Sequence, residues 1–447
     1  MSLSLGVPGF QPLPELAADP AGWAAVSASL ARKIFLRAEG TAVAVGAPQL
    51  VEPALAARLR ELTGRFAGFY RRAIASYFER PDLAGDYLLN PLLAPLLPLD
   101  RAAPFPDPAH RFDAVLDARG ELRIIENNSV GICLFHYRSH LYLIRELDRR
   151  GMTAAARALE VEIGELVAGF RRYYEAAHPA PRERPTIGSL APREWLRAGQ
   201  LLFRAAFERH GFDYVYGGPD SLEVTRDGLR LRGRPIDLLW SDFLFYPAYQ
   251  ADRYLQTRFP SRLGRYDDAP AHVAALLADP RLLAHLAERR VIHVSPATSY
   301  LGLPKLLLGW IHRADRPVPD EDRAYLARHV ARTYAAADRL GGVLERDAAI
   351  ARREALLLKP CQYGGSHGVV IGREVTADAW AARLAEIWED QTWVLQDFIE
   401  PVRTAGGAWL SLGLSAFGDR MGGVVLRTSP RCTVSARDAD FIPTVLP

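Results

Sequence analysis

The spacing of apolar residues along the chain predicts alternating helical and strand segments. In residues 50–78, apolar side chains recur every three to four positions, which is typical of an amphipathic helix. We expect residues 23–89 to be mostly helical and residues 141–178 to form one or two further amphipathic helices. The proline-rich residues 90–108 interrupt this pattern and predict a long connecting loop.

The middle of the chain has a different pattern. Short apolar runs at residues 186–190, 212–216 and 236–240 are typical of buried strands, and residues 194–210 have the spacing of a helix. Two shorter runs that flank an Asp-Gly pair predict a hairpin between the second and third strands. This order of strand, helix, strand, hairpin and strand predicts a small α/β domain.

Two apolar runs, residues 112–116 and 122–125, flank a turn sequence that contains glycine and predict an antiparallel hairpin. Asp113 lies on the first strand, and Glu126 and Asn128 follow the second. Asp113 then falls opposite the end of the second strand, so three oxygen ligands meet at one end of the sheet. Oxygen ligands without cysteine or histidine suit Mg²⁺ that bridges phosphates, rather than zinc. The alternative is a polar loop, but a glutamate after two isoleucines is costly to bury without a partner.

Residues 356–372 predict a second hairpin, with a glycine-rich tip. Three leucines lead into Lys359 and Pro360, and an apolar run at residues 369–371 follows the tip. Glycine lets backbone N–H groups approach a phosphate, and a lysine at a strand end supplies positive charge. No GK[ST] sequence follows the glycines, so this is not a Walker loop. A lid over a triphosphate and an ordinary hairpin with a loose tip are the two interpretations. The tip consists of Gly364, Gly365, Ser366, His367 and Gly368.

The basic residues are strongly biased toward arginine. Of 55 Lys and Arg residues, only Lys33, Lys305 and Lys359 are lysine. Lys305 precedes an apolar helix predicted at residues 306–311, where the positive end of the helix dipole repels a positive charge. This position favours a side chain that faces a ligand; the alternative is a surface lysine whose charged end reaches water.

Composition and charge exclude several classes of protein. The chain has 447 residues, enough for two or three domains, with 49% hydrophobic and 24% charged residues. A net charge of +3 gives no broad electrostatic attraction for nucleic acid or an anionic membrane. No run of 18 or more apolar residues is present to span a bilayer, and the first residues lack the features of a signal peptide.

The cysteines indicate a reducing compartment. Cys133, Cys361 and Cys432 are odd in number and widely spaced, so neither a disulfide framework nor a cysteine metal site follows. We therefore expect a cytoplasmic protein that binds neither nucleic acid nor membrane.

In their order along the chain, these motifs resemble the circularly permuted branch of the ATP-grasp superfamily, in particular glutathionylspermidine synthetase-like proteins. Residues 356–372 are similar to the phosphate-covering hairpin of that family, and residues 393–401 (WVLQDFIEP) to its adenine-binding hinge strand. Residues 111–113 with residues 126–128 are similar to its metal-binding hairpin. In ordinary ATP-grasp chains the metal carboxylates follow the lysine strands. Here they precede Lys359 by more than 200 positions, which is the permuted order.

The resemblance, which runs from Arg111 to the end of the sequence, implies a fold and an activity. The fold would be a circularly permuted ATP-grasp fold of mixed α+β and α/β type, with antiparallel sheets that sandwich ATP, a small α/β domain and N-terminal helices. The activity would be that of an ATP- and Mg²⁺-dependent carboxylate–amine ligase that releases ADP. A small carboxylate, such as an amino acid or small peptide, would form an acyl phosphate, and an amine would then displace phosphate to give an amide.

The resemblance also implies roles for residues at matching positions. Asp113, Glu126 and Asn128 would bind Mg²⁺, and Arg111 and Arg427 would lie near the transferred phosphoryl group. The nucleotide would be bound by Lys305, Lys359, Gly364, Gly365, Ser366, His367, Gly368, Gln396, Asp397 and Phe398.

Four regions follow from the pattern and the resemblance. A linker rich in proline and charge at residues 178–185 marks one boundary. We expect an N-terminal helical region at residues 1–110, and the metal-binding hairpin and helices of the ATP-grasp core at residues 111–180. The small α/β domain would occupy residues 181–290, and the nucleotide-binding region with the glycine-rich lid residues 291–447.

Two other functions stay open at this point. One is a nucleotide-binding module without catalysis that serves a regulatory role, and the other is a phosphotransferase that acts on a hydroxyl. The complete set of predicted metal ligands argues against the first. The second differs in its product, which would be a phosphate ester rather than an amide and inorganic phosphate.

Overall fold

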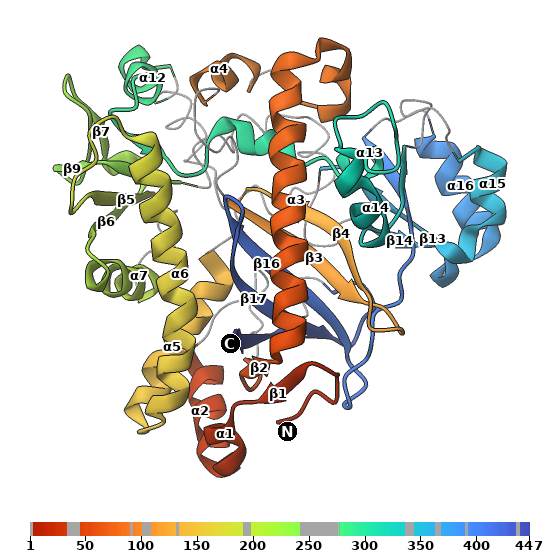
Figure 1. The fold of residues 1–447 in the computed structure, drawn as a ribbon, viewed down its shortest axis with the longest axis horizontal. Coiled ribbons are helices and arrows are strands. Elements are labelled where there is room, and N and C mark those ends of the chain that lie inside the picture. Colours follow the sequence, from red (N-terminus) through yellow and green to blue (C-terminus); the bar gives the residue numbers. More distant parts are fainter. Residues whose placement is uncertain are drawn as a thin grey trace.

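The protein, described by a computed structural model, is of mixed α/β class. Within the described residues, helices surround four β-sheets of seven, four, four and three strands. Figure 1 shows the seven-stranded sheet in the centre, with a four-stranded sheet on either side. Among the helices of this part of the chain, none is both long and apolar enough to cross a lipid bilayer. The structure describes residues 3–33, 45–89, 93–100, 109–130, 134–190, 198–241, 276, 278–335, 344–362, 368–388, 392–434 and 439–447.

Segments from both ends of the chain build the central sheet, in the order β1-β2-β18-β17-β16-β3-β4. Neighbouring strands are antiparallel except β2 and β18, which are parallel. The prediction that residues 23–89 are mostly helical missed β2, because three extended residues are too few to show an alternating pattern. The hairpin predicted at residues 112–125 is confirmed as β3 and β4. The strands are β1 (Phe10–Pro12), β2 (Gln49–Val51), β3 (Ala109–Leu116), β4 (Leu122–Asn128), β16 (Trp409–Phe417), β17 (Arg420–Ser429) and β18 (Asp440–Val445).

Helices cover both faces of the central sheet. α3 (Pro53–Glu79) crosses one face, where strand residues such as Phe112 and Leu412 join its apolar side in the core (Figure 1). α5 (Leu134–Arg149) and α6 (Thr153–Ala177) pack on the opposite face. Both predictions of helices in these segments are confirmed. Because successive strand residues point to opposite faces, the residues next to Phe112 and Leu412 face away from α3.

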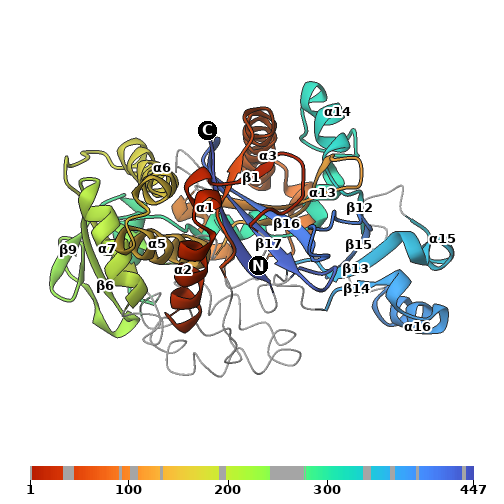
Figure 2. The same ribbon diagram turned by 90° about the horizontal axis from the view of Figure 1, so that it is seen from below.

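A smaller antiparallel sheet, in the order β12-β15-β13-β14, carries the lysine hairpin. Leu358 and Trp393 point to one face and pack with Trp380 of α16, so α15 and α16 cover that face. Figure 2 shows both helices on the outer side of this sheet, away from the central one. The hairpin at residues 356–372 is confirmed, although residues 363–367 of its tip lie outside the described residues. The elements are β12 (Thr333–Ala335), β13 (Leu356–Pro360), β14 (Val370–Ile371), β15 (Trp393–Asp397), α15 (Arg346–Ala351) and α16 (Ala377–Ile387).

The predicted small α/β unit is present as a parallel sheet in the order β11-β10-β5-β6. A three-stranded antiparallel sheet, β7-β8-β9, adjoins it. The single strand predicted at residues 236–240 is divided at Asp237, whose carboxylate accepts a hydrogen bond from the Thr186 N–H (2.8 Å). The elements are β5 (Thr186–Leu190), α7 (Ala198–Arg209), β6 (Asp213–Gly217), β7 (Leu222–Val224), β8 (Leu229–Leu231), β9 (Arg234–Ile236), β10 (Leu238–Trp240) and β11 (Ile292–His293).

Shorter helices pack at the edges of the sheets. α2 lies against α5, α13 against β12, and α14 against α3. The predicted helix at residues 306–311 is confirmed as α13. These helices are α1 (Pro14–Ala18), α2 (Pro20–Lys33), α4 (Leu97–Asp100), α12 (Pro280–Ala287), α13 (Leu306–Trp310) and α14 (Asp320–Arg328), with 3-10 turns at Pro81–Tyr87, Ala94–Leu96, Pro219–Ser221, Ala297–Gly302, Arg353–Ala355 and Gly372–Glu374.

A glycine allows α6 to approach the central sheet closely. A Cβ atom on Gly169 would lie 2.7 Å from Cγ and 2.9 Å from Cβ of Phe417, which is closer than carbon atoms approach. Gly164 lies one and a half turns earlier on the same helix. A Cβ atom there would make only an ordinary van der Waals contact, with His210 Cε1 at 3.6 Å. Both glycines therefore lie inside the same helix, but only Gly169 is packed tightly against a neighbouring side chain.

We predict opposite effects for alanine at these two positions. Gly164→Ala should raise the free energy of unfolding by about 0.5–1 kcal/mol, because alanine is the better helix former. Gly169→Ala should lower it by about 1–2 kcal/mol, because the clash with Phe417 outweighs the gain in propensity. Urea denaturation of both variants checks the prediction, and stabilisation by Gly169→Ala would contradict the close packing.

Candidate functional site

The β3–β4 hairpin places four predicted site residues on one face. Asp113 lies opposite the end of β4, as predicted, where it pairs with Glu126, and Arg111 pairs with Asn128. Their neighbour Phe112 packs in the core beneath α3, so these four side chains lie on the face away from α3. The amide of Asn128 donates to the Arg111 carbonyl at 3.5 Å, which leaves its side-chain oxygen to face the same side.

A β-bulge in β4 connects this hairpin to the lysine hairpin. One extra residue, Ile125, lies between the partners of Asp113 and Ala114, so it has no partner of its own in the ladder. Its carbonyl accepts hydrogen bonds from the Lys359 ammonium (2.8 Å) and the Gln396 side-chain amide (3.3 Å). Both donors come from the smaller antiparallel sheet, so the two sheets meet at this carbonyl.

Ion pairs hold the carboxylates of the hairpin. Lys305 Nζ lies 3.2 Å from Glu126 Oε1. Arg111 Nε and Arg427 Nη2 lie 2.8 Å and 3.1 Å from the two oxygens of Asp113. Burial opposes ionisation of Asp113, but the two arginines outweigh it and hold the pKa of that carboxyl below its ordinary value. The sequence-predicted arginines and carboxylates are therefore brought together.

Lys359 is a buried cation with an altered proton affinity. Only 4% of the residue is exposed. Burial, opposed by attraction to Glu126 and assisted by repulsion from Lys305, lowers the pKa of the Lys359 ammonium to about 7. A nearby phosphate would favour the charged form and raise this pKa again.

We call these groups the charged cluster. It contains four basic side chains and two carboxylates, so positive charge is in excess when all are ionised. An excess of partly buried positive charge attracts an anion, and a polyphosphate carries enough charge to balance it. The charged cluster consists of Arg111, Asp113, Glu126, Lys305, Lys359 and Arg427.

The side chains of the three residues predicted to bind adenine do not all point the same way, because successive residues of an extended segment face opposite sides of the sheet. Gln396 is fully buried and faces the charged cluster through the Ile125 carbonyl. The Asp397 carboxylate lies on the other face of the sheet, 3.0 Å from Arg352 Nη2. The Phe398 ring lies beneath the Arg373 guanidinium at 4.1 Å. The structure therefore brings only Gln396 to the charged cluster by its side chain, and any contact of Asp397 with a nucleotide would involve its backbone.

One glycine of the predicted lid is described. Gly368 has a φ of +73°, a conformation that favours glycine. A Cβ atom there would lie 3.0 Å from Pro360 Cγ and 3.2 Å from the Trp393 ring, so both backbone and space require glycine. The predicted site residues Gly364 to His367 lie outside the described residues.

Two residues of β16 were missed by the sequence predictions. A Cβ atom on Gly413 would lie 3.1 Å from Arg111 Cδ and 2.9 Å from Val425 Cγ1, so this glycine makes room for the arginine side chain. Ser411 pairs with Arg427 across β16 and β17. The Ser411 hydroxyl and Arg427 Nε are both buried, and neither has a hydrogen-bond partner among the described residues.

A signal for these residues is visible in the strand sequence. Residues 411–415 read Ser-Leu-Gly-Leu-Ser, with leucines that alternate with small residues. One face of such a strand has no bulky side chain of its own, so side chains or a ligand from elsewhere must fill the space. Here the Arg111 side chain extends over Gly413.

The predicted oxygen donors suit magnesium, which keeps water and phosphate ligands, better than a metal ion that is held entirely by protein side chains. Within the described ranges, no cluster of three or more His, Cys, Asp or Glu side chains could hold a metal ion. The predicted set has two carboxylates, Asp113 and Glu126, and the amide oxygen of Asn128, all on one face. Magnesium commonly takes one or two carboxylates and completes its shell with water and phosphate oxygens. The residues present fit that donor set.

Comparisons with known proteins bear on the fold. No protein-family model and no curated protein matches the sequence. Among solved structures, the chain is similar to a glutathione synthetase-like effector from Globodera pallida in its apo form. Identity is 12% and the TM-score 0.53, over 98% of this chain and 100% of that chain. It is also similar to a protein provisionally named gamma-glutamylcysteine synthetase from Methylobacillus flagellatus, with 12% identity and a TM-score of 0.34, over 86% of this chain and 88% of that chain.

The first likeness shows a shared fold. It distinguishes neither the glutathionylspermidine synthetase-like branch nor the permuted order of the motifs. The mixed class, with antiparallel sheets and a small α/β unit, agrees with the prediction.

We predict that Lys359→Met stabilises the protein at neutral pH. The ammonium pKa is about 7 in the folded state and 10.5 in the unfolded chain, so the unfolded chain binds more protons between these values. The cost of burying Lys359 is therefore full below about pH 7 and disappears as the pH rises toward 10.5. The variant should gain about 1–3 kcal/mol at pH 7, after loss of the hydrogen bond to Ile125.

Urea denaturation at pH 7, 8.5 and 10 measures this difference. It should shrink as the pH rises, because the unfolded lysine then loses its proton too. A variant that is less stable at pH 7, or a difference independent of pH, would show that Lys359 is not a buried charge.

Proposed function

We propose that this protein is an ATP- and Mg²⁺-dependent carboxylate–amine ligase of the ATP-grasp type. The observation that carries the proposal is the charged cluster, in which buried cations are in excess where two antiparallel sheets meet. A site of this kind suits phosphoryl transfer, which depends on positioning and on neutralising charge. The shared fold with a glutathione synthetase-like effector adds support from the architecture.

In this proposal, the lysines bind the phosphates. Lys305 and Lys359 approach the same hairpin from two different segments, so their ammonium groups would hold a polyphosphate from two directions. The glycine-rich tip at residues 364–368 would cover the phosphates. Adenine would lie along β15, with Gln396 on the inner face and the backbone of Asp397 and Phe398 at its edge.

The arginines would bind the reacting groups. Asp113 holds Arg111 and Arg427 side by side, so their remaining N–H groups have a fixed direction. Such groups can orient the planar oxygens of a substrate carboxylate by paired hydrogen bonds. Arg427 Nε and the Ser411 hydroxyl, which lack partners among the described residues, are available to the same substrate.

The reaction then follows in two steps. A carboxylate oxygen of the substrate attacks the γ-phosphorus of ATP, which gives an acyl phosphate and ADP. An amine attacks the acyl carbon, inorganic phosphate leaves with the electron pair of the broken C–O bond, and the nitrogen loses a proton to water as the amide forms. Throughout, the cations stabilise charge on the transferred group. Asp113, Glu126 and Asn128 would hold Mg²⁺, which when bound neutralises phosphate charge.

The finer assignment to the circularly permuted, glutathionylspermidine synthetase-like branch is part of this proposal. It is supported by the order of the contacting segments: β3 and β4 precede Lys359 by more than 200 positions and yet contact it. An ordinary ATP-grasp chain would place the metal hairpin after the lysine strands.

We predict that Lys359→Met weakens binding of ATP by about tenfold or more, because one of two phosphate-binding cations is lost. Titration calorimetry with Mg²⁺–ATP measures the affinity. Arg157→Met, which removes an exposed cation on α6, serves as a control and should leave it unchanged. Equal affinities in the wild-type protein and Lys359→Met would contradict the nucleotide site.

We further predict that hydroxylamine intercepts an acyl phosphate. The protein is incubated with ATP, Mg²⁺, hydroxylamine and one member at a time of a set of amino acids and small peptides. The true acid should give a hydroxamate with release of ADP, because hydroxylamine replaces the amine. Release of AMP and pyrophosphate would identify an adenylating enzyme, and a stable phosphate ester would identify a phosphotransferase; either result contradicts the ligase.

A further inference from the structure

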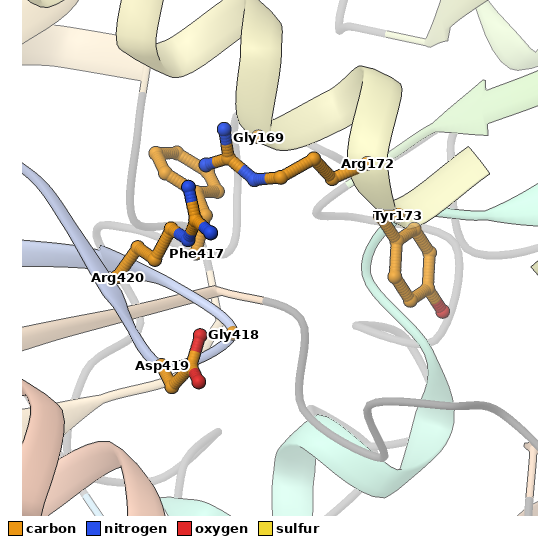
Figure 3. Close-up of a pocket in the computed structure, with 7 residues that line it drawn as sticks. All are labelled: Gly169, Arg172, Tyr173, Phe417, Gly418, Asp419 and Arg420. Atoms are coloured by element: carbon orange, nitrogen blue, oxygen red, sulfur yellow. The ribbon is translucent and has the colours of Figure 1, made fainter. Parts of the chain in front are cut away.

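A small pocket lies beyond the charged cluster, between α6 and the turn that joins β16 to β17. Its volume is about 170 Å³. Figure 3 shows its walls, which come from one helix and one hairpin turn. The lining residues are Gly169, Arg172, Tyr173, Phe417, Gly418, Asp419 and Arg420.

Local sequence fixes the shape of this pocket. Gly418 has a φ of +64° and is followed by Asp419 with a negative φ, the pattern of a tight type II′ hairpin turn. Phe417 and Arg420 pair across this turn, so their positions are set by the ladder. Gly169 brings α6 against the Phe417 ring, and one turn later the helix supplies Arg172. The pocket is therefore built on regular elements.

The charges in the pocket are unbalanced. Within the described part of the chain, neither Arg172 nor Arg420 has an ion pair or a hydrogen-bond partner. Figure 3 shows their guanidinium groups pointing toward one another beside the Phe417 ring, with the Asp419 carboxylate apart from both. Two like charges that converge repel each other, and an anion between them would turn this repulsion into attraction.

We propose that this pocket binds a small oxyanion, a carboxylate or a phosphate, between Arg172 and Arg420. Two guanidinium groups match the paired oxygens of such an anion. The rings of Tyr173 and Phe417 provide apolar walls for a short carbon stem. Binding here requires no nucleotide, so the inference does not depend on the ligase activity.

The position of the pocket relates it to the charged cluster. Phe417 pairs with Ala109 and Ser415 pairs with Arg111, on the same pair of strands. Two residues along a strand correspond to about 7 Å. The Arg111 side chain extends away from the pocket, over Gly413, and Arg427 pairs with Ser411 still further along β16, so the anion binds at the turn end of the strand as a ligand separate from the charged cluster.

Titration calorimetry with inorganic phosphate and, separately, with succinate tests the proposal at constant ionic strength. The titrations use Lys359→Met as the parent protein, so that phosphate binds more weakly at the nucleotide site. At least one probe should show saturable binding. Arg172→Gln and Arg420→Gln should each weaken it about tenfold, because one of two paired cations is lost. Asp419→Asn should tighten it, by at most about threefold, because a negative charge at the wall of the same pocket is removed.

Controls separate this site from the nucleotide site. Arg157→Gln, on the exposed side of α6, should leave binding of the probe unchanged. In the wild-type background, Arg172→Gln should leave affinity for Mg²⁺–ATP unchanged. Binding of succinate alone would assign the anion as a carboxylate, and binding of phosphate alone as a phosphate. Absence of saturable binding of both probes, or binding undiminished by Arg172→Gln and Arg420→Gln, would overturn the proposal.

Discussion

The hydrogen bond from the Lys359 ammonium to the Ile125 carbonyl is the contact on which the candidate site depends. It joins residues 234 positions apart and brings the smaller antiparallel sheet against the edge of the central one. The carbonyl is available because Ile125 is the extra residue of a bulge and has no ladder partner. Lys305 then reaches Glu126 in the next position of the same strand. Next to the bulge, Ile124 also pairs with the segment before β12, through hydrogen bonds with the His329 carbonyl and the Ala331 N–H.

The buried charges of the candidate site lower the stability of the fold, although the proposed function needs them. A buried lysine, and a carboxylate shared by two arginines, cost desolvation energy that an apolar core would not. The cost is consistent with a site that binds an anion. Phosphate oxygens would accept hydrogen bonds from the buried cations and would balance their charge. The surrounding packing keeps the charges in place: the Arg111 side chain lies over Gly413, and Phe112 beneath it is locked in the core.

Local features of the site could be predicted from the sequence, and long-range ones could not. The turn between β3 and β4 places Asp113 opposite the end of β4, as predicted, and the bulge at Ile125 then pairs it with Glu126 rather than with Ile125. The bulge at Ile125 cannot be recognised in the pattern of apolar residues. Asp397 faces away from the charged cluster because successive residues of β15 point to opposite faces of the sheet. The pairing of β2 with β18 joins the two ends of the chain and has no local signal.

If the protein binds ATP as proposed, the phosphates lie at the charged cluster, between the two sheets. A crystal structure with a non-hydrolysable ATP analogue and Mg²⁺ would show this. We expect phosphate oxygens at hydrogen-bond distance, about 3 Å, from both Lys305 Nζ and Lys359 Nζ, with adenine along β15. A nucleotide bound elsewhere, for example at the end of the parallel sheet formed by β5, β6 and β10, would contradict it.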